Sequence, residues 1–351
     1  MNTMTAAPVA VTVFALTVSA LLTGLVRATV ARHMLDHPNE RSSHSSAVPR
    51  GGGLAVVAVV LGVIAWSGWR GAIAPNVAIA LMGGGSSVAF VGWLDDRSSL
   101  SSTLRLGVHT LAAVWTVAWL GGFPALTLGE STLAFGAVGS ILAALAVVWS
   151  TNLFNFMDGI DGIAGMEALS VGLFGGLLLL ARGAPGLGGV ALATAGAALG
   201  FLCWNWSPAR IFMGDVGSGF LGYLLAGLAL ASENAQALPA LVWLILASAF
   251  VLDATVTLLR RVRRGYWRDA HRTHAYQRAV QGGLSHAQVA ALVGLINAVL
   301  GIIAIVVTAR PAGVLGGVAA ALVLVGAIYA LVGRSVPFPD LPRRSVRSSR
   351  D

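Results

Sequence analysis

The sequence has little charge, one cysteine and no lysine. Only 10% of its 351 residues are charged and 56% are hydrophobic, whereas a soluble domain usually carries about 25% charged residues. Such a chain cannot cover itself with a polar surface, which argues against both a soluble globular protein and a disordered one. Its long unbroken apolar runs do not fit the alternating pattern of a transmembrane β-barrel. The composition therefore predicts an all-α fold, a polytopic membrane helix bundle.

The scarcity of cysteine and lysine limits the chemistry further. Cys203 lies in an apolar run, so an intrachain disulfide and a cysteine-based metal site are both excluded. All 22 basic residues are arginines, and the net charge is +8. This charge could indicate a nucleic-acid partner, but in a membrane protein it marks the cytoplasmic loops. We therefore expect membrane lipid, and no nucleic acid, as a partner.

Eleven apolar segments are present, most of them near the length of about 20 residues that a membrane span needs. They cover residues 8–28, 51–66, 74–93, 104–120, 131–149, 162–181, 186–204, 216–231, 236–259, 287–309 and 312–333. About 11 transmembrane helices are thus predicted, and an odd number puts the two termini on opposite sides. We expect one integral-membrane domain over residues 1–333.

The arginines predict the orientation of these spans. If the loops alternate sides, one side carries 19 arginines and the other carries Arg70, Arg182 and Arg310 alone. Because positive charge marks the cytoplasmic side, the N-terminus is expected outside and the C-terminus in the cytoplasm. Residues 334–351 are expected to form a flexible basic cytoplasmic tail.

Carboxylates gather at predicted helix ends on the arginine-rich side. They are Asp95, Asp96, Asp158, Asp161 and Asp215, and Asn152 and Asn155 lie beside them in the sequence. Acids at membrane boundaries are costly, and a hard cation such as Mg²⁺ would stabilise them, because it prefers carboxylates and phosphate oxygens. The alternative is helix capping, with Asp161 at the start of segment six and Asp215 at the start of segment eight. Five acids on one face favour the metal.

Basic groups on the same side suit phosphate oxygens. Arg105, His271, Arg272 and His274 provide them. Acids for a metal and cations for phosphate together indicate phosphoryl transfer. The alternatives are an ordinary solvated loop for the two histidines and, for the run 260–264, an anchor to anionic lipid headgroups. His109 is expected to pack between helices, and Asp253 is expected to be structural, paired with a neighbouring helix or with Arg260.

The ordered motifs resemble those of one family. The run Asn152-x-x-Asn155-x-x-Asp158-Gly159-x-Asp161-Gly162, followed by Gly214-Asp215-x-Gly217-Ser218, is similar to the polyprenyl-phosphate N-acetylhexosamine-1-phosphate transferases. That family includes the phospho-N-acetylmuramoyl-pentapeptide translocase, the initiators of O-antigen and teichoic acid synthesis, and the dolichyl-phosphate enzyme. The resemblance covers residues 36 to about 283. It implies a bundle of ten or eleven helices with a cytoplasmic active site.

The resemblance also implies a role for each motif residue. Asp215 matches the Mg²⁺ ligand, for which Mn²⁺ could substitute, and Asn155 matches an asparagine on or near the metal. The other four acids match catalytic positions, and further polar residues match substrate-binding positions. The catalytic set is Asp95, Asp96, Asp158 and Asp161; the substrate-binding set is Asn152, Arg105, His271, Arg272 and His274. Whether Asp95 acts as base, nucleophile or positioning group is left open.

The implied reaction joins two phosphates at the bacterial inner membrane. Undecaprenyl phosphate attacks a UDP-N-acetylhexosamine, UMP leaves, and a lipid-linked sugar diphosphate forms as the first membrane step of cell-envelope glycan synthesis. The loop has His271-Arg272-Thr273-His274 where the translocase branch has consecutive histidines. This difference favours the O-antigen or teichoic-acid branch, with UDP-GlcNAc or a related deoxy or epimeric sugar as donor.

Two other classes of protein fit part of the sequence. A transporter or flippase would suit eleven helices, but transporter sites lie near the bilayer midplane, whereas these polar residues gather at one face. A structural scaffold would need no acid cluster. The oligomeric state is left open, a homodimer included.

Overall fold

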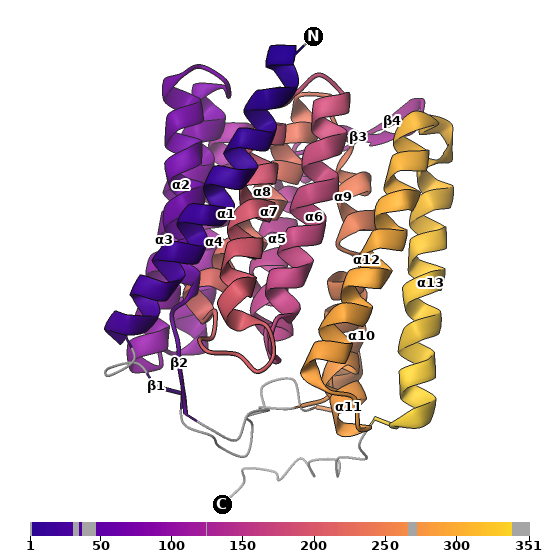
Figure 1. Ribbon diagram of the computed structural model, residues 1–351. Helices are drawn as coiled ribbons and strands as arrows, with labels where there is room; N and C mark the ends of the chain where they lie inside the picture. Colours follow the sequence, from indigo (N-terminus) through magenta and orange to yellow (C-terminus); the bar gives the residue numbers. More distant parts are fainter. Residues whose placement is uncertain (1, 31–34, 37–46, 124, 266–271, 339–351) are drawn as a thin grey trace, which may run out of the picture.

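The computed structural model describes residues 2–30, 35–36, 47–123, 125–265 and 272–338, and shows a helical bundle (Figure 1). In the first two thirds of the chain the helices are α1 (Asn2–Val30), α2 (Gly53–Trp69), α3 (Pro75–Ser98), α4 (Ser102–Leu120), α5 (Val138–Met157), α6 (Ile163–Ala181), α7 (Pro185–Asn205) and α8 (Asp215–Asn234). The remaining helices are α9 (Ala240–Leu246), α10 (Ser248–Arg263), α11 (Ala275–Gln281), α12 (His286–Ala309), η1 (Pro311–Gly313) and α13 (Val314–Ser335). Two short antiparallel strand pairs complete the described part: β1 (Leu35–Asp36) with β2 (Val48–Pro49), and β3 (Ala125–Leu128) with β4 (Ser131–Ala134).

Local sequence signals set several helix boundaries. Proline stands at the start of α3 and of α7, where its missing N–H would have no partner in any case. Ser101 caps α4 by accepting a hydrogen bond from the Leu104 N–H at 3.2 Å. Ser285 caps α12 in the same way, and Gln288 completes a capping box there.

The all-α membrane fold expected from composition is confirmed, and the protein is an integral membrane protein. Each of the eleven predicted segments contains a helix. Among the described residues, eight helices are long and apolar enough to cross a membrane, or nine if α9 and α10, which meet at 79°, count as one broken span. α2 is shorter, at 17 residues, and α4, which carries Arg105 and His109, is not among the eight.

The fifth predicted span is misplaced. Residues 131–134 form strand β4, and α5 begins at Val138 and continues to Met157. Asn152 and Asn155, expected in a loop, therefore lie in the last two turns of a helix. The polar residues that suggested a loop are the part of α5 that faces other helices and the acid cluster.

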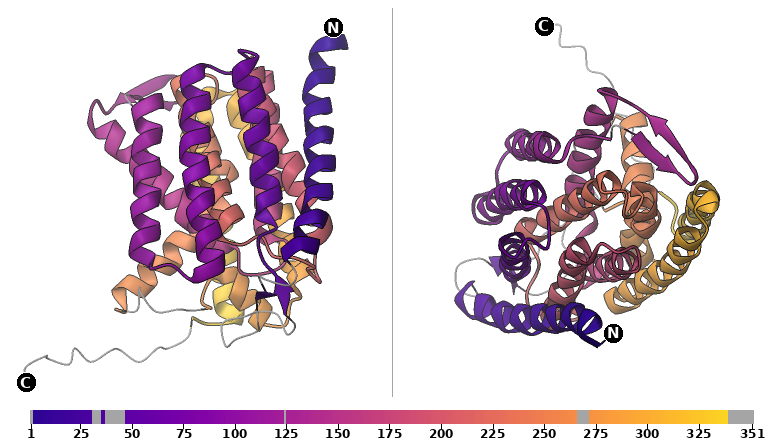
Figure 2. Two further views of the ribbon diagram at one scale, coloured as in Figure 1. Left: turned by 90° about the vertical axis from the view of Figure 1, so that its left-hand side faces the viewer. Right: turned by 90° about the horizontal axis from the view of Figure 1, so that it is seen from above.

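α7 and α8 lie at the centre of the bundle (Figure 2). Viewed from above, α2 to α4 flank this centre on one side, α12 and α13 lie on another, and α1 packs along the outside against α7. Close packing depends on glycine: a Cβ on Gly222 of α8 would collide with the Ser150 carbonyl of α5. In lipid, such close approach of backbones is what holds helices together.

The two ends of the bundle carry different structural elements and side chains. We call the end with the β3–β4 hairpin the hairpin end; there the Oε1 atom of Glu233 accepts hydrogen bonds from the N–H (2.9 Å) and hydroxyl (2.6 Å) of Thr127. We call the opposite end, where α3 and α5 finish and α4 and α8 begin, the acid end. α1 starts at the hairpin end and α13 finishes at the acid end (Figure 1). The tail expected over residues 334–351 lies outside the described residues from position 339 onward.

Candidate active site

Two loops from distant parts of the sequence join at the acid end. The Phe212 N–H donates to the Pro49 carbonyl at 2.8 Å, and the Gly52 and Gly53 N–H groups donate to the carbonyls of Phe212 and Met213, both at 2.9 Å. Gly53 also packs directly on the backbone of Gly217. This pairing fixes the start of α2 against the start of α8.

Asp96 of α3 caps helix α8. Its Oδ1 accepts a hydrogen bond from the Asp215 N–H at 3.0 Å and its Oδ2 accepts one from the Val216 N–H at 3.2 Å. Asp215 is the first residue of α8 and Gly214 is its N-cap, so the alternative in which Asp215 itself caps this helix is wrong. Because Asp96 performs the capping, the carboxylate of Asp215 is available for other contacts.

Arg105 joins the remaining two carboxylates of this group. Its Nη1 atom lies 2.6 Å from Asp95 Oδ2 and 2.7 Å from Asp215 Oδ2. The other oxygen of Asp95 accepts a hydrogen bond from the Leu100 N–H at 2.5 Å, so the turn between α3 and α4 orients it. The ends of three helices thus bring one guanidinium between two carboxylates that are 120 residues apart in sequence.

The asparagines of α5 face two different neighbours. Asn155 donates to the hydroxyl of Ser218, in the first turn of α8, at 3.5 Å. Asn152 lies with its Oδ1 3.3 Å from Nδ1 of His109, which is buried in α4 as expected for a packing residue. The structure therefore brings Asn155 to the acid cluster and ties Asn152 to α4.

Asp158 ends helix α5 close to the same charges. Burial, followed by the negative charges of Asp215 and Asp96, raises the pKa of Asp158 from 3.8 to about 8, and the positive charge of Arg50 opposes this. Asp158 is therefore expected to hold a proton at neutral pH when no cation is bound nearby.

Asp161 does not cap α6, so the capping alternative is wrong for this residue as well. The N-cap of α6 is Gly162, at φ +79°, and no side chain caps it. Instead, Asp161 Oδ2 accepts from the Ala209 N–H at 3.2 Å and lies 3.3 Å from Nδ1 of His286. Burial alone would raise the pKa of Asp161, but His286 and the Ala209 N–H outweigh it and lower the pKa. Asp161 therefore connects the segment between α5 and α6 with the loop between α7 and α8 and with the start of α12.

The loop before α11 is fastened by Asp253. Its oxygens accept from the N–H groups of Ala275 (2.9 Å) and Tyr276 (3.3 Å), and Oδ1 lies 3.4 Å from Nδ1 of His274. The expected structural role of Asp253 is confirmed, with His274 rather than Arg260 as its partner. The Tyr276 hydroxyl donates to the Phe156 carbonyl at 3.1 Å, which seats this loop on the end of α5.

The other predicted basic residues differ in how far the structure describes them. His271 lies outside the described residues. The Arg272 carbonyl accepts from Gln281 Nε2 at 2.9 Å, and the buried His274 ring stacks on Tyr276 at 5.7 Å. Of the predicted phosphate-binding cations, Arg105 is therefore the one whose described contacts reach the acid cluster.

Sequence reasoning missed two residues of this region. Arg50, whose charge acts on Asp158, stands between Pro49 and three glycines, an unusual setting that could have marked it. His286 carried no assigned role, yet it faces Asp161. Nothing local in the sequence indicates that contact, because the two residues are 125 positions apart.

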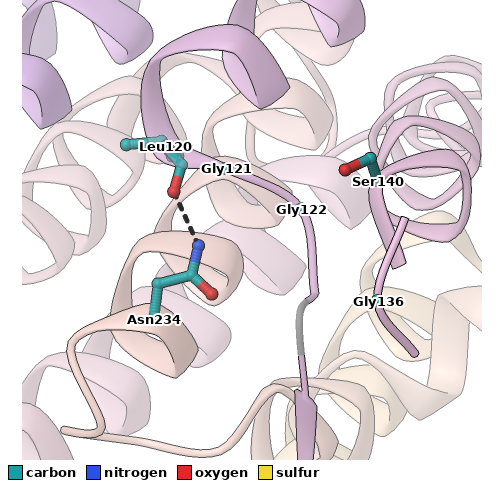
Figure 3. Close-up of a pocket in the computed structure, with 6 residues that line it drawn as sticks. All are labelled: Leu120, Gly121, Gly122, Gly136, Ser140 and Asn234. Carbon is teal, nitrogen blue, oxygen red and sulfur yellow. Dashed lines mark hydrogen bonds between the residues drawn. The ribbon is translucent and has the colours of Figure 1, made fainter. Parts of the chain in front are cut away.

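Two hollows are present at the hairpin end. One, of about 300 Å³, is lined by Leu120, Gly121, Gly122, Gly136, Ser140 and Asn234 (Figure 3). In it, Asn234 Nδ2 donates to the Leu120 carbonyl at 2.8 Å. The second hollow, of about 220 Å³, lies beside Glu233 and the β3–β4 hairpin. Neither contains a member of the acid cluster, which lies at the opposite end of the bundle.

Comparison with known proteins identifies this arrangement. The family model described as glycosyl transferase family 4 matches residues 78–233, from α3 to the end of α8. The matched region contains all five acids of the predicted cluster.

Curated relatives match along most of the chain. A probable undecaprenyl-phosphate N-acetylglucosaminyl 1-phosphate transferase of Bacillus subtilis is 30% identical, covering 78% of this chain and 76% of its own. A decaprenyl-phosphate N-acetylglucosaminephosphotransferase of Mycobacterium tuberculosis is 31% identical with the same coverage. A phospho-N-acetylmuramoyl-pentapeptide-transferase of Synechococcus is 35% identical, covering 70% of this chain and 74% of its own. The resemblance read from the motifs is confirmed: the chain belongs to glycosyl transferase family 4, the polyprenyl-phosphate sugar-1-phosphate transferases.

Proposed function

We propose that this protein transfers N-acetylhexosamine 1-phosphate from a UDP-sugar to undecaprenyl phosphate and releases UMP. The observation that carries the proposal is the contact of Arg105 with both Asp95 and Asp215. It brings acidic side chains and a guanidinium for phosphate to one point where the ends of three helices meet. The names of the curated relatives support the same reaction class.

The carboxylates suit a Mg²⁺ ion that the substrate helps to bind. Among the described residues, no three His, Cys, Asp or Glu side chains converge closely enough to enclose a metal alone. Mg²⁺ usually keeps waters and takes one or two carboxylates together with substrate phosphates. Asp215 provides a carboxylate of this kind, and Asn155 stands near it on α5. When bound, the ion would supply positive charge to the pyrophosphate.

The residues of the chain orient the two phosphates. Arg105 offers planar N–H donors to phosphate oxygens, and the N-terminus of α8, capped by Asp96, directs its positive end toward the cluster. An oxygen of undecaprenyl phosphate attacks the β-phosphorus in one step. The bond from that phosphorus to the bridging oxygen breaks, and the oxygen leaves with UMP.

We propose that Asp95 positions the lipid phosphate rather than removing a proton from it. A phosphate monoester has a second pKa of about 6, so it is mostly a dianion at neutral pH and needs no base. Asp158 and Asp161 shape the loop that follows α5, Asp158 next to the cluster and Asp161 through Ala209 and His286.

We propose a compact donor, UDP-GlcNAc or a related deoxy or epimeric sugar, for the synthesis of a cell-envelope glycan. The residues His271-Arg272-Thr273-His274 differ from the consecutive histidines of the translocase branch. We place the acid end in the cytoplasm of a bacterial inner membrane, where UDP-sugars are made, because the arginines concentrate there.

The test is UMP release by the purified protein with undecaprenyl phosphate and a panel of UDP-sugars. We expect release with UDP-GlcNAc or a close analogue, none with UDP-muramoyl-pentapeptide, loss in chelator, and recovery with Mg²⁺ or Mn²⁺. Efficient use of the pentapeptide donor would overturn the donor assignment alone. Absence of UMP with every donor, together with lipid-linked substrate movement in proteoliposomes, would favour the transporter.

A further inference from the structure

Three arginine side chains gather around two aromatic rings at the acid end, between α10, α11 and α13. The Cζ atoms of Arg260 and Arg278 lie 4.9 and 5.1 Å from the ring centre of Tyr329. The Cζ of Arg264 lies 5.1 Å from the ring centre of Phe338. We call these five residues the arginine–aromatic cluster. It holds three positive charges within a small volume.

Arg278 is the buried member of this cluster. Its side chain is fully buried, and Nη1 donates to the Val336 carbonyl at 2.8 Å. Among the described residues, neither Nε nor Nη2 of Arg278 has a hydrogen-bond partner. A buried charge without an ionic partner is costly, so a negative charge placed close to Arg278 would be stabilising.

No described carboxylate provides that anion. Asp253, the acid of α10, uses its oxygens for the α11 backbone, for Thr257 and for His274. Within the described part of the chain, neither Arg260 nor Arg278 has a carboxylate oxygen within 4.0 Å.

The surroundings of the cluster suit a lipid better than a free ion. Leu259 and Val262, beside Arg260 in α10, are each 50% exposed, and Leu331, beside Tyr329 in α13, is 58% exposed. Exposed apolar side chains next to exposed guanidiniums match the acyl chains and the phosphate of one lipid molecule. Tyrosine is also typical of the depth at which headgroups lie.

We propose that the arginine–aromatic cluster binds the phosphodiester of an anionic phospholipid. Arg260 and Arg264 reach the phosphate from the exposed side, and the positive charge of the fully buried Arg278 lies behind them. The sequence suggested that the run 260–264 anchors the protein to anionic headgroups. The proposed site contains two arginines of that run, together with Arg278 and the rings of Tyr329 and Phe338. Because Arg278 belongs to α11, whose start Asp253 and His274 fasten, the headgroup would also stabilise the loop next to the end of α5.

The test is thermal unfolding of the purified protein in detergent with added phosphatidylglycerol, phosphatidylcholine or inorganic phosphate. We expect a saturable rise in Tm with phosphatidylglycerol and none with the other two. Each basic residue at a membrane surface is worth about fivefold in affinity, so the double variant Arg260→Gln, Arg264→Gln should need about 30-fold more lipid. Arg263→Gln is the matched control, an exposed arginine of the same run with no contact to either ring among the described contacts.

Three results would overturn the proposal. They are an equal rise in Tm with inorganic phosphate, an unchanged lipid response in the double variant, and an equal loss in Arg263→Gln. Arg278→Gln tests the contribution of the buried arginine. If Arg278→Gln does not fold, the double variant of the two exposed arginines provides the test instead. The measurement is lipid binding, so it is independent of the proposed transferase activity.

Discussion

Neighbouring acids in this sequence have different roles in the structure. Asp95 and Asp96 are adjacent in α3, yet Asp95 contacts Arg105 while Asp96 accepts from two backbone N–H groups of α8. A carboxylate that caps a helix stabilises it by about 1 kcal/mol, whereas one that meets a cation can take part in substrate binding. Substitutions can therefore separate the two roles.

Asp215→Asn is expected to abolish turnover and leave the fold intact. The capping hydrogen bond uses the backbone N–H of Asp215, which the variant keeps. The side chain loses its charge, so the Mg²⁺ site weakens and Arg105 keeps only Asp95. UMP release should disappear, Mn²⁺ binding by equilibrium dialysis should weaken, and Tm should change little. The matched contrast is Asp96→Asn, which should lower Tm because an amide has one acceptor oxygen for two N–H groups. Near-normal turnover in Asp215→Asn would contradict the metal role.

Asp158 should make the stability of the metal-free protein fall as pH rises. Its pKa is 3.8 when unperturbed and about 8 in the folded protein. Between these values the folded state binds more protons than the unfolded state, so the free energy of unfolding decreases with increasing pH. We expect Tm in EDTA to fall between pH 6 and pH 8. Asp158→Asn, which resembles the protonated acid, should flatten that fall; an equal slope in both proteins would show that Asp158 is not its source.

The acids could be identified from the sequence, but their partners could not. The capping alternative considered only the residues next to a helix start, and so it paired Asp215 with α8 and Asp161 with α6. The cap of α8 comes from Asp96, 119 residues away, and Asp161 faces His286, 125 residues away. Such contacts depend on tertiary packing, for which one sequence carries no signal.

At the scale of elements, hydropathy located the helices and misjudged one boundary. Residues 131–134 were included in the fifth predicted span, but Gly129, at φ +80°, lies in the turn of a hairpin formed by residues 125–134. The polar end of α5 stays helical because its side chains bond within the bundle, as Ser150 does to the Gly222 carbonyl at 2.7 Å. Apolar content predicts burial in lipid, whereas the helix end depends on partners from other helices.

Gly53→Ala is expected to destabilise the junction of α2 and α8. A Cβ there would lie 2.6 Å from the Gly217 nitrogen and 2.9 Å from the Met213 carbonyl oxygen, and backbone atoms cannot move aside easily. We expect a loss of about 1–3 kcal/mol in unfolding free energy, as for overpacking, and a parallel loss of turnover. Gly62→Ala, in the same helix with nothing within 4 Å of its Cβ, is the control and should be neutral or stabilising. Equal Tm values for the two variants would contradict the close approach.

At the scale of the whole molecule, the bundle has two chemically distinct ends. The acid end carries the carboxylate cluster, Arg105 and the arginine–aromatic cluster, and the hairpin end carries the β3–β4 hairpin fixed by Glu233. Composition predicted this asymmetry because the arginine counts of the two sides are 19 and 3. The sequence defines the number of spans less sharply than the asymmetry, since α2 is short, α4 carries Arg105 and His109, and α9 and α10 form one bent pair.

Labelling of single cysteines in intact cells should place the acid end in the cytoplasm. Cys203 is the one cysteine of the chain, so Cys203→Ala gives a background without thiols. Ser98→Cys would mark the acid end and Ser131→Cys the hairpin end; both positions are exposed. An impermeant maleimide should label position 131 directly and position 98 only after permeabilisation, because loops rich in arginine are retained inside. The reverse pattern would put the carboxylates outside, away from cytoplasmic UDP-sugars, and the proposed reaction could not take place there.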